Sequence, residues 1–304
     1  MNKISAAIVV KNYPKYLEKT IDSIKNFVDE IVIFDIGIEE NLNRKLLKDK
    51  KNKIVKINKT VPYVELIREE EKKYLKNDWV LFIDPDEIFP QAALPIIQRE
   101  INHYDCLSFP RKNIIFNHFV RYSRFWPDYQ TRLFKKRTLF WPKQIHSQPE
   151  IKGKEYTFEA KEEFAILHYN YENLDSWFEK YLRYAKNEAW YYDNTGKDYS
   201  FKKAAKKALN ELISRYFAAS GYKDGLIGLT LSILQMFYYF IVYFYFLEAK
   251  NFRIEGENQP KLIQNFFADG FYESNFWLRK KKLTDKKDSL KKKIANLLLK
   301  IVKE

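Results

Sequence analysis

The sequence predicts an α/β fold in which a doubly wound, mostly parallel sheet precedes a helical C-terminal region. Short apolar runs alternate with amphipathic helical segments over the first 83 residues, and helical patterns dominate from about residue 175 onwards. The composition agrees with a folded protein. Of 304 residues, 46% are hydrophobic, and eight glycines and ten prolines exclude a low-complexity chain.

The N-terminal elements follow one another as a series of βαβ units. We expect strands at 4–10, 30–35, 53–57 and 79–83, and helices at about 14–26 and 61–76. In the first helix Leu17, Ile21 and Ile24 share one face, as in a helix that covers a sheet. Right-handed crossovers place the carboxyl ends of parallel strands along one edge. We therefore expect Asp35 and Asp84 to face a single crevice.

Three carboxylates follow the last of these strands directly, in the run Asp84-Pro85-Asp86-Glu87. Carboxylates this close repel one another unless a cation lies between them, and Mg²⁺ or Mn²⁺ prefers oxygen ligands. Ligands of open α/β sheets bind beyond the carboxyl ends of the strands, which is where this run lies. The run therefore indicates a divalent-metal site. The alternative is an acidic turn that only ends the strand.

The chain lacks the glycine-rich loops that bind phosphate in many nucleotide-binding folds. The turn at residues 11–14 contains no glycine, and no G-x-G-x-x-G or Walker A run occurs. Phosphate must then be bound by a metal and by side chains. Residues 106–171 are rich in aromatic and strand-forming residues, and we expect them to cap the crevice. The single cysteine, Cys106, cannot form an internal disulfide, which favours a reducing compartment.

Helices are expected to dominate the C-terminal half. The pattern predicts a helix at 176–191 with Asp175 as its N-cap, and another at 201–219 that ends before Gly221. Residues 225–247 then carry no charge over 23 positions but include four tyrosines, which prefer the headgroup interface. This composition favours a helix inserted in one leaflet; the alternatives are a true span and a helix buried within the protein or within an oligomer.

The basic residues are concentrated at the C-terminus. The formal net charge is +14, and residues 279–304 alone hold eleven Lys or Arg against three acidic residues, a net +8. Apolar residues there recur at helical spacing, at Leu290, Ile294, Leu297, Leu298 and Ile301. A basic amphipathic helix suits an anionic membrane surface, and the alternative is a solvated helix or disordered end. We expect three segments, at 1–171, 172–250 and 251–304, the last being this tail.

Several motifs recur in one order along the chain. The first are Asp35, Arg68 and the acidic run. The next is the segment Trp-Pro-Asp-Tyr-Gln at 126–130. It is followed by Arg132-Leu133-Phe134, Trp141, His146, His168-Tyr169, Asp224-Gly225 and Gly228. In this order they resemble family 2 glycosyltransferases, and in particular the branch of bacterial lipopolysaccharide-core β-glucosyltransferases. The likeness covers residues 4–247.

The chain departs from the family pattern in three places. Residues 35–40 lack the hydroxyl side chains that the family usually has after the second strand. Arg68 is followed by Glu69 where asparagine is usual, and His146 is followed by Ser147 where glutamate is usual. The last change removes a carboxylate often found beside the acceptor, which leaves the general base open.

The resemblance implies a GT-A type, Rossmann-like catalytic domain and a metal-dependent, inverting hexosyltransferase. Its donor would be a UDP-linked hexose, with glucose as the expected sugar, and its acceptor would be a lipid-linked saccharide such as lipopolysaccharide core or another cell-envelope glycan. The enzyme would work at the cytoplasmic face of the inner membrane, as a peripheral or monotopic protein. The alternatives are a polyprenyl-phosphate glycosyltransferase and a non-catalytic basic protein that binds membrane or nucleic acid; clustered carboxylates argue against nucleic acid.

The resemblance also implies roles on the donor side. Asp86 would be the main ligand of Mg²⁺ or Mn²⁺, and Asp84 would share the metal or hold the ribose. His146 would be a third ligand or a donor to the leaving phosphate. Asp35 would contact the nucleotide unless it only caps a turn, and Arg68 would bind a phosphate or carboxylate unless it is a surface helix residue.

The remaining roles concern the acceptor and the diphosphate. Arg132 would hold the diphosphate unless it forms a structural ion pair. One base must take the proton of the acceptor hydroxyl, and Asp128 and Glu150 are the candidates. Glu87 would orient the acceptor or bind the metal through water. His168 is interpreted as a packed or hydrogen-bonded residue at the boundary of the domain.

Overall fold

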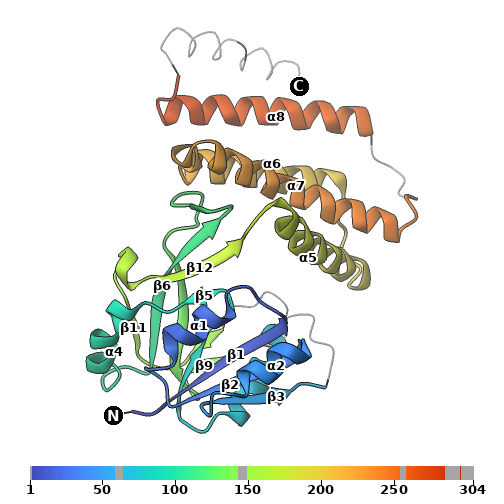
Figure 1. Ribbon diagram of the computed structural model, residues 1–304. Coiled ribbons are helices and arrows are strands. Elements are labelled where there is room, and N and C mark those ends of the chain that lie inside the picture. Colours follow the sequence, from blue (N-terminus) through green and yellow to red (C-terminus); the bar gives the residue numbers. More distant parts are fainter. Residues whose placement is uncertain (1, 59–63, 143–148, 254–257, 285–294, 296–304) are drawn as a thin grey trace. The chain divides into compact units, whose positions relative to one another are not determined.

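A computed structural model describes residues 2–58, 64–142, 149–253, 258–284 and 295 (Figure 1). The chain forms two compact units. Unit 1 comprises residues 1–114 and 126–170, and unit 2 comprises residues 115–125 and 171–304. The predicted tail helix and His146 lie outside the described residues.

Unit 1 is built on a mixed sheet whose first half is parallel. β1 (Ile4–Asn12) lies between β2 (Glu30–Ile38) and β4 (Trp79–Phe82), and β3 (Asn52–Lys56) flanks β2. These four strands confirm the predicted parallel half, with ends shifted by up to three residues. The predicted α/β class, a doubly wound sheet followed by a helical region, is confirmed.

The second half of the sheet is largely antiparallel. β8 (Asp128–Lys135) pairs antiparallel with both β4 and β6 (Cys106–Ile115). β12 (Ile166–Tyr171) pairs antiparallel with β5 (Glu87–Ile88), and the short β11 (Glu155–Thr157) runs parallel to β6. β7 (His118–Phe119) also pairs with β6, while β9 (Leu139–Phe140) and β10 (Glu150–Ile151) form a separate ribbon. These pairings bring β5, β6, β8 and β12 together at the end of β4.

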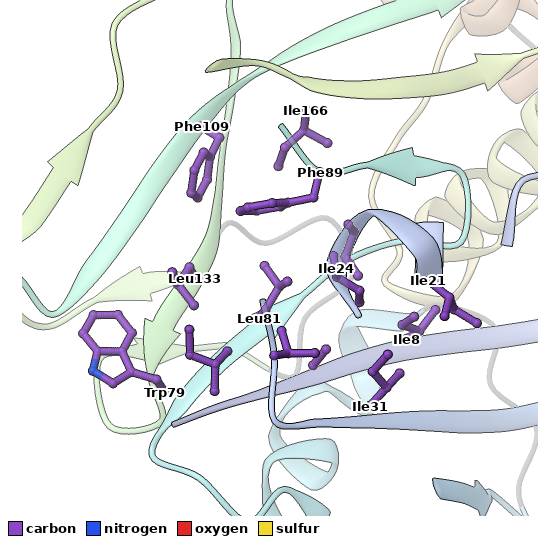
Figure 2. Packing of buried hydrophobic residues seen from close by; sticks show 14 of the residues in the cluster. Ile8, Ile21, Ile24, Ile31, Trp79, Leu81, Phe89, Phe109, Leu133 and Ile166 are labelled. Carbon is purple, nitrogen blue, oxygen red and sulfur yellow. The ribbon is translucent and has the colours of Figure 1, made fainter. Parts of the chain in front are cut away.

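Both faces of β1, β2 and β4 are buried over most of their length, which explains why these strands are apolar runs rather than alternating ones. On one face, Ile8, Ile31 and Leu81 pack with Ile21 and Ile24 of α1 (Leu17–Ile24) (Figure 2). A second apolar cluster holds the intervening residues of the same strands, among them Ala7, Val32, Phe34, Val80 and Phe82. Two further helices of unit 1 are α2 (Glu40–Leu46) and α4 (Leu94–Glu100).

The helix predicted at 61–76 is wrong as a single helix over its described part. Residues 64–76 form the 3₁₀ turn Val64–Leu66, the four-residue α3 (Arg68–Glu71) and the 3₁₀ turn Lys72–Tyr74. Arg68, Glu71 and Lys72 do share an inward face, as helical spacing predicts, but that face is charged. Arg68 bonds to Asp84 and Lys72 to the Leu139 carbonyl, and such tertiary bonds override weak helix propensity.

Unit 2 is helical. It contains α5 (Leu174–Asn194), α6 (Phe201–Ile213), α7 (Leu226–Ala249) and α8 (Gln259–Lys280). α7 contacts both α5 and α6, and α8 contacts α6. The predicted helices at 176–191 and 201–219 are confirmed, although the second ends in a π-helical turn at Ser214–Ala218. The predicted N-cap Asp175 lies inside α5, because Asn173 and Ser176 form the capping box.

α7 covers the charge-free run and is the one described helix long and apolar enough to cross a membrane, a criterion that core helices also meet. Its polar groups bond to α5: Tyr238 donates to Glu188 at 2.7 Å, and Gln235 accepts from Tyr181 at 2.9 Å. Leu226, Phe237 and Phe244 are exposed. At spacings of 11 and 7 residues, they lie along one stripe of the helix.

Candidate active site

The acidic run after β4 forms a tight turn that is tied to β12. The Glu87 amide donates to the Asp84 carbonyl at 3.0 Å, and the Asp84 amide donates to Glu87 Oε2 at 3.1 Å. Glu87 lies opposite His168 in the pairing of β5 with β12, and the Tyr169 amide donates to the Asp86 carbonyl at 3.0 Å. These bonds fix the backbone of the turn, and one of them also holds the carboxylate of Glu87.

Asp84 is held by two arginines from different elements. Arg68 of α3 donates to Oδ1 at 3.0 Å, and Arg132 of β8 donates to Oδ2 at 2.7 Å. Burial raises the pKa of Asp84, but the guanidinium groups of Arg132, Arg68 and Arg111 outweigh it and hold this pKa well below its usual range. Asp84 is therefore ionised, with each oxygen committed to a guanidinium group.

Glu87 joins the same network from a fully buried position. Its Oε1 accepts from Arg132 at 2.6 Å and from Arg111 of β6 at 3.3 Å. Arg132 therefore bridges Asp84 and Glu87, while its Nε atom is buried without a hydrogen-bond partner. This position fits the structural ion pair that the sequence left open for Arg132.

Asp128 lies at the far end of this network. Its Oδ2 accepts from Arg111 Nε at 2.9 Å, from Arg111 Nη2 at 2.6 Å and from Asn113 at 3.1 Å. Its Oδ1 accepts from Gln130 at 3.0 Å. Burial raises the pKa of Asp128, but Arg111 and these hydrogen bonds together lower it. Asp128 is an ionised and heavily hydrogen-bonded carboxylate.

His168 connects Asp128 to the acidic turn. Its Nδ1 lies 2.7 Å from Asn113 Oδ1, and its Nε2 lies 3.6 Å from Asp86 Oδ2. Sequence reasoning treated His168 as a packed residue and did not single out Arg111 or Asn113. A pattern could have found the last two, because Arg111 and Asn113 stand at alternate positions of one strand and therefore share one face.

The other predicted site residues lie apart from this network. Asp35 lies near the end of β2, two strands from β4, and its Oδ1 accepts from the Gly37 and Ile38 amides at 2.7 Å each. Asp35 thus closes a turn, the alternative weighed above. Glu150 is an exposed residue of β10, with Lys152 at 3.5 Å.

The charges of the network leave room for a cation. Four carboxylates, those of Glu71, Asp84, Glu87 and Asp128, face the guanidinium groups of Arg68, Arg111 and Arg132, while the carboxylate of Asp86 lies beside His168. Counted as formal charges, these five carboxylates exceed the three guanidinium groups by two. The described residues contain no cluster of three or more metal-ligating side chains, but His146 lies outside them. Asp86, whose side chain is 35% exposed, has only His168 within ion-pair distance among the described residues.

Comparison with known proteins places unit 1 in context. Residues 5–150 match the model of Glycosyl transferase family 2. The match supports a glycosyltransferase domain of this family, which contains the acidic turn and most of the network. The lipopolysaccharide-core branch inferred from the motifs stays a prediction.

Individual relatives are distant. An uncharacterized glycosyltransferase of Rickettsia bellii is 28% identical over 159 residues. The match covers 48% of this chain and 50% of the relative, so this chain spans about half the length of that protein. The solved structure of S. aureus TarS 1-349 with UDP is 16% identical, with 89% of this chain and 80% of that one covered and a TM-score of 0.43. Glucosyl-3-phosphoglycerate synthase of Mycobacterium tuberculosis, solved with Mn²⁺ and UDP-glucose, is 21% identical over 37% of this chain and 43% of its own, with a TM-score of 0.28. Their ligands are properties of those proteins.

Proposed function

We propose that this chain is an inverting glycosyltransferase that moves a hexose, with glucose the first choice, from a UDP-linked donor to a lipid-linked saccharide. One observation carries the proposal: an acidic turn, in which Asp86 has no guanidinium partner among the described residues, ends the central strand of a domain that matches the glycosyltransferase family. Such a turn suits a divalent cation that binds a nucleotide diphosphate.

On the donor side, Asp86 is the proposed ligand of Mg²⁺ or Mn²⁺, because its carboxylate is not paired with a guanidinium group in the described part of the chain. A bound cation would neutralise charge on the leaving diphosphate. Asp84, committed to Arg68 and Arg132, contributes negative charge close to that cation. Asp35 would contact the nucleoside through Oδ2, because the turn uses Oδ1 to accept its two hydrogen bonds.

On the acceptor side, Asp128 is preferred to Glu150 as the base, because it belongs to the network whereas Glu150 is an exposed residue of the β10 ribbon. A low pKa makes Asp128 a weak base. That favours a second candidate acceptor, a polyprenyl phosphate, whose phosphate is already ionised and needs little help from a base.

The proposed location is the cytoplasmic face of the inner membrane. The exposed stripe of α7 at Leu226, Phe237 and Phe244 supports insertion into one leaflet, and the basic residues after α8 suit anionic headgroups. A protein in this position would meet its lipid-linked acceptor at the membrane surface.

The test is calorimetric titration of the full chain with UDP-, GDP- and TDP-sugars, each with and without Mn²⁺. The proposal expects one nucleotide to bind only when the metal is present, and transfer to a lipid-linked acceptor to release that nucleoside diphosphate. Folded protein that binds no sugar nucleotide under any metal condition would contradict it.

A further inference from the structure

We propose that a pocket in unit 2 binds the phosphate group of an anionic membrane lipid. The pocket is formed by the connection of α5 to α6 and by α6 itself, and its volume is about 520 Å³, within the range of small-ligand sites. We call it the lysine pocket, because it is lined by Lys197, Lys203, Lys206 and Lys207. The inference rests on the proposed location at the membrane and names the lipid group that the protein would bind there.

The back of the lysine pocket is aromatic and packed. Tyr199 is 1% exposed, belongs to the apolar cluster that joins α5, α6 and α7, and stacks on Tyr192 with 4.3 Å between ring centroids. The ammonium group of Lys207 donates to the Tyr192 hydroxyl at 2.8 Å. It also lies 5.2 to 5.6 Å from the ring centroids of Tyr192, Tyr199 and Tyr239. These cation–π contacts and the hydrogen bond hold one positive charge at a fixed place in the pocket.

The acidic groups near the pocket are already bonded. Asp198 is the one carboxylate in the lining, and it accepts a hydrogen bond from Lys203 at 2.9 Å. Glu188 lies 3.8 Å from the Lys207 ammonium group and also accepts from the hydroxyl of Tyr238. Four lysines therefore line a pocket that contains a single carboxylate.

Two of these lysines have no carboxylate partner among the described residues. Lys197 donates to the hydroxyl of Tyr191, which is a neutral group, at 2.7 Å. Lys206 makes no hydrogen bond or ion pair with another residue in the described part of the chain. Lys203 and Lys207 stand three residues before it and one after it, so they share a face of α6 with one another. Phosphate oxygens in the pocket would accept charge-assisted hydrogen bonds from these ammonium groups.

The surroundings of the pocket favour a lipid over a soluble phosphate. The ring of Phe201, the first residue of α6, lies 6.0 Å from that of Phe240 on α7, and Phe240 stacks on Phe244 at 6.4 Å. Phe244 belongs to the exposed apolar stripe of α7. Aromatic residues beside lysines match a bilayer that contains anionic lipids, because its acyl chains lie next to its phosphates.

The first experiment measures sedimentation of the full chain with vesicles of phosphatidylglycerol and phosphatidylcholine. Lys206→Gln should weaken vesicle binding about 10- to 100-fold, the loss expected when a hydrogen bond to a charged group is removed. The matched control is Lys202→Gln, which changes an exposed lysine of the same helix outside the lysine pocket. It should lose about fivefold at most, because only general attraction to the surface is reduced. Equal losses would contradict the proposal, since binding would then depend on surface charge alone.

A second variant has an expected effect of the opposite sign, which misfolding cannot imitate. Asp198→Asn removes the carboxylate that bonds to Lys203, and with it one negative charge from the pocket. The variant should therefore bind the same vesicles about fivefold more tightly than the wild type. Unchanged or weaker binding would count against a phosphate in this pocket.

Calorimetric titration distinguishes a lipid from a soluble source of phosphate. We expect dihexanoyl phosphatidylglycerol, below its micelle concentration, to bind the wild type more tightly than inorganic phosphate or glucose 6-phosphate. Lys206→Gln should weaken the binding of this lipid. Tighter binding of glucose 6-phosphate than of the lipid would overturn the assignment to a membrane lipid.

The proposed function can fail separately. Lys206→Gln should bind UDP-glucose in the presence of Mn²⁺ like the wild type. A wild type that binds UDP-glucose with Mn²⁺ but no phosphatidylglycerol would overturn the lipid site and leave the donor chemistry standing. Vesicle binding that depends on Lys206, without binding of any sugar nucleotide, would support the lipid site and contradict the proposed function.

Discussion

The two units use their charged and aromatic residues in opposite ways. In unit 1, Arg68, Glu87 and Arg132 are buried. Both arginines bond to Asp84, and Arg132 also bonds to Glu87. In unit 2, Trp190 and Phe244 are exposed, while the hydroxyl of Tyr238 is bonded to Glu188. Buried ion pairs specify one geometry but contribute little net stability, whereas exposed aromatic residues are available to a partner. Chemistry is therefore expected from unit 1, and contact with the membrane from unit 2.

The largest expected effect comes from breaking the network of unit 1. Arg132→Met removes the bridge between Asp84 and Glu87 and leaves two carboxylates without it, which should lower the free energy of unfolding by about 3–5 kcal/mol. Lys135 on the same strand pairs with Asp105 at 2.7 Å in a more exposed site, so Lys135→Met should cost less than about 1 kcal/mol. Urea denaturation of both variants measures the two losses. Equal losses would show that the buried network contributes no more to stability than the exposed ion pair.

Acid should destabilise unit 1 next. The pKa values of Asp84 and Asp128 are lower in the folded than in the unfolded protein, so both contribute stability above about pH 4. As the pH falls below that value towards the folded pKa, the free energy of unfolding should drop by at most about 1.4 kcal/mol per pH unit for each group. Denaturation from pH 2.5 to 6 measures this slope, and Asp128→Asn should make it shallower. An unchanged slope would mean that Asp128 titrates normally.

A smaller loss is expected from the bonds inside unit 2. Tyr238→Phe removes the 2.7 Å hydrogen bond to Glu188 and should lower the free energy of unfolding by about 1–2 kcal/mol. Tyr245 on the same helix is a half-buried tyrosine, and Tyr245→Phe should have a smaller effect. If both substitutions lower the free energy of unfolding equally, the hydrogen bond between α7 and α5 makes no specific contribution to stability.

The smallest effect on folding is expected at the exposed stripe of α7. Phe244→Ser should change the free energy of unfolding by less than about 0.5 kcal/mol, since this side chain is 53% exposed. Its binding to phosphatidylglycerol vesicles should fall about tenfold in sedimentation, because burial of a phenylalanine is worth about 1.5–3 kcal/mol. Tyr129→Ser, an exposed aromatic of unit 1, serves as the control. Equal binding by both variants would argue against α7 as the docking surface.

The parallel half of the fold could be predicted from the sequence because its information is local. Apolar runs and helical periodicity specify β1 to β4 and α1, and the carboxylates stand directly after β4. Pairing between distant strands is not local. The contacts of Arg111 with Asp128 and of Arg132 with Glu87 depend on β6 and β8 meeting at the end of β4, which no short pattern encodes.

The failed prediction of a single helix at 61–76 has the same origin. Arg68 and Lys72 fit a helical face, but their long-range bonds break the helix into turns. Asp35 was placed correctly at the end of a strand, whereas its use of Oδ1 to close a turn depends on local backbone geometry. His168 occurs in a short apolar strand where nothing nearby in the sequence indicates Asp86 as its neighbour.

The central claim is that the acidic turn after β4 binds a nucleotide-sugar through a divalent cation. The most direct test is calorimetric titration of UDP-glucose into the wild type and Asp86→Asn, each with and without Mn²⁺. The account predicts binding by the wild type that requires Mn²⁺, and none by a folded Asp86→Asn. Metal-independent binding, or equal binding by both proteins, would contradict it.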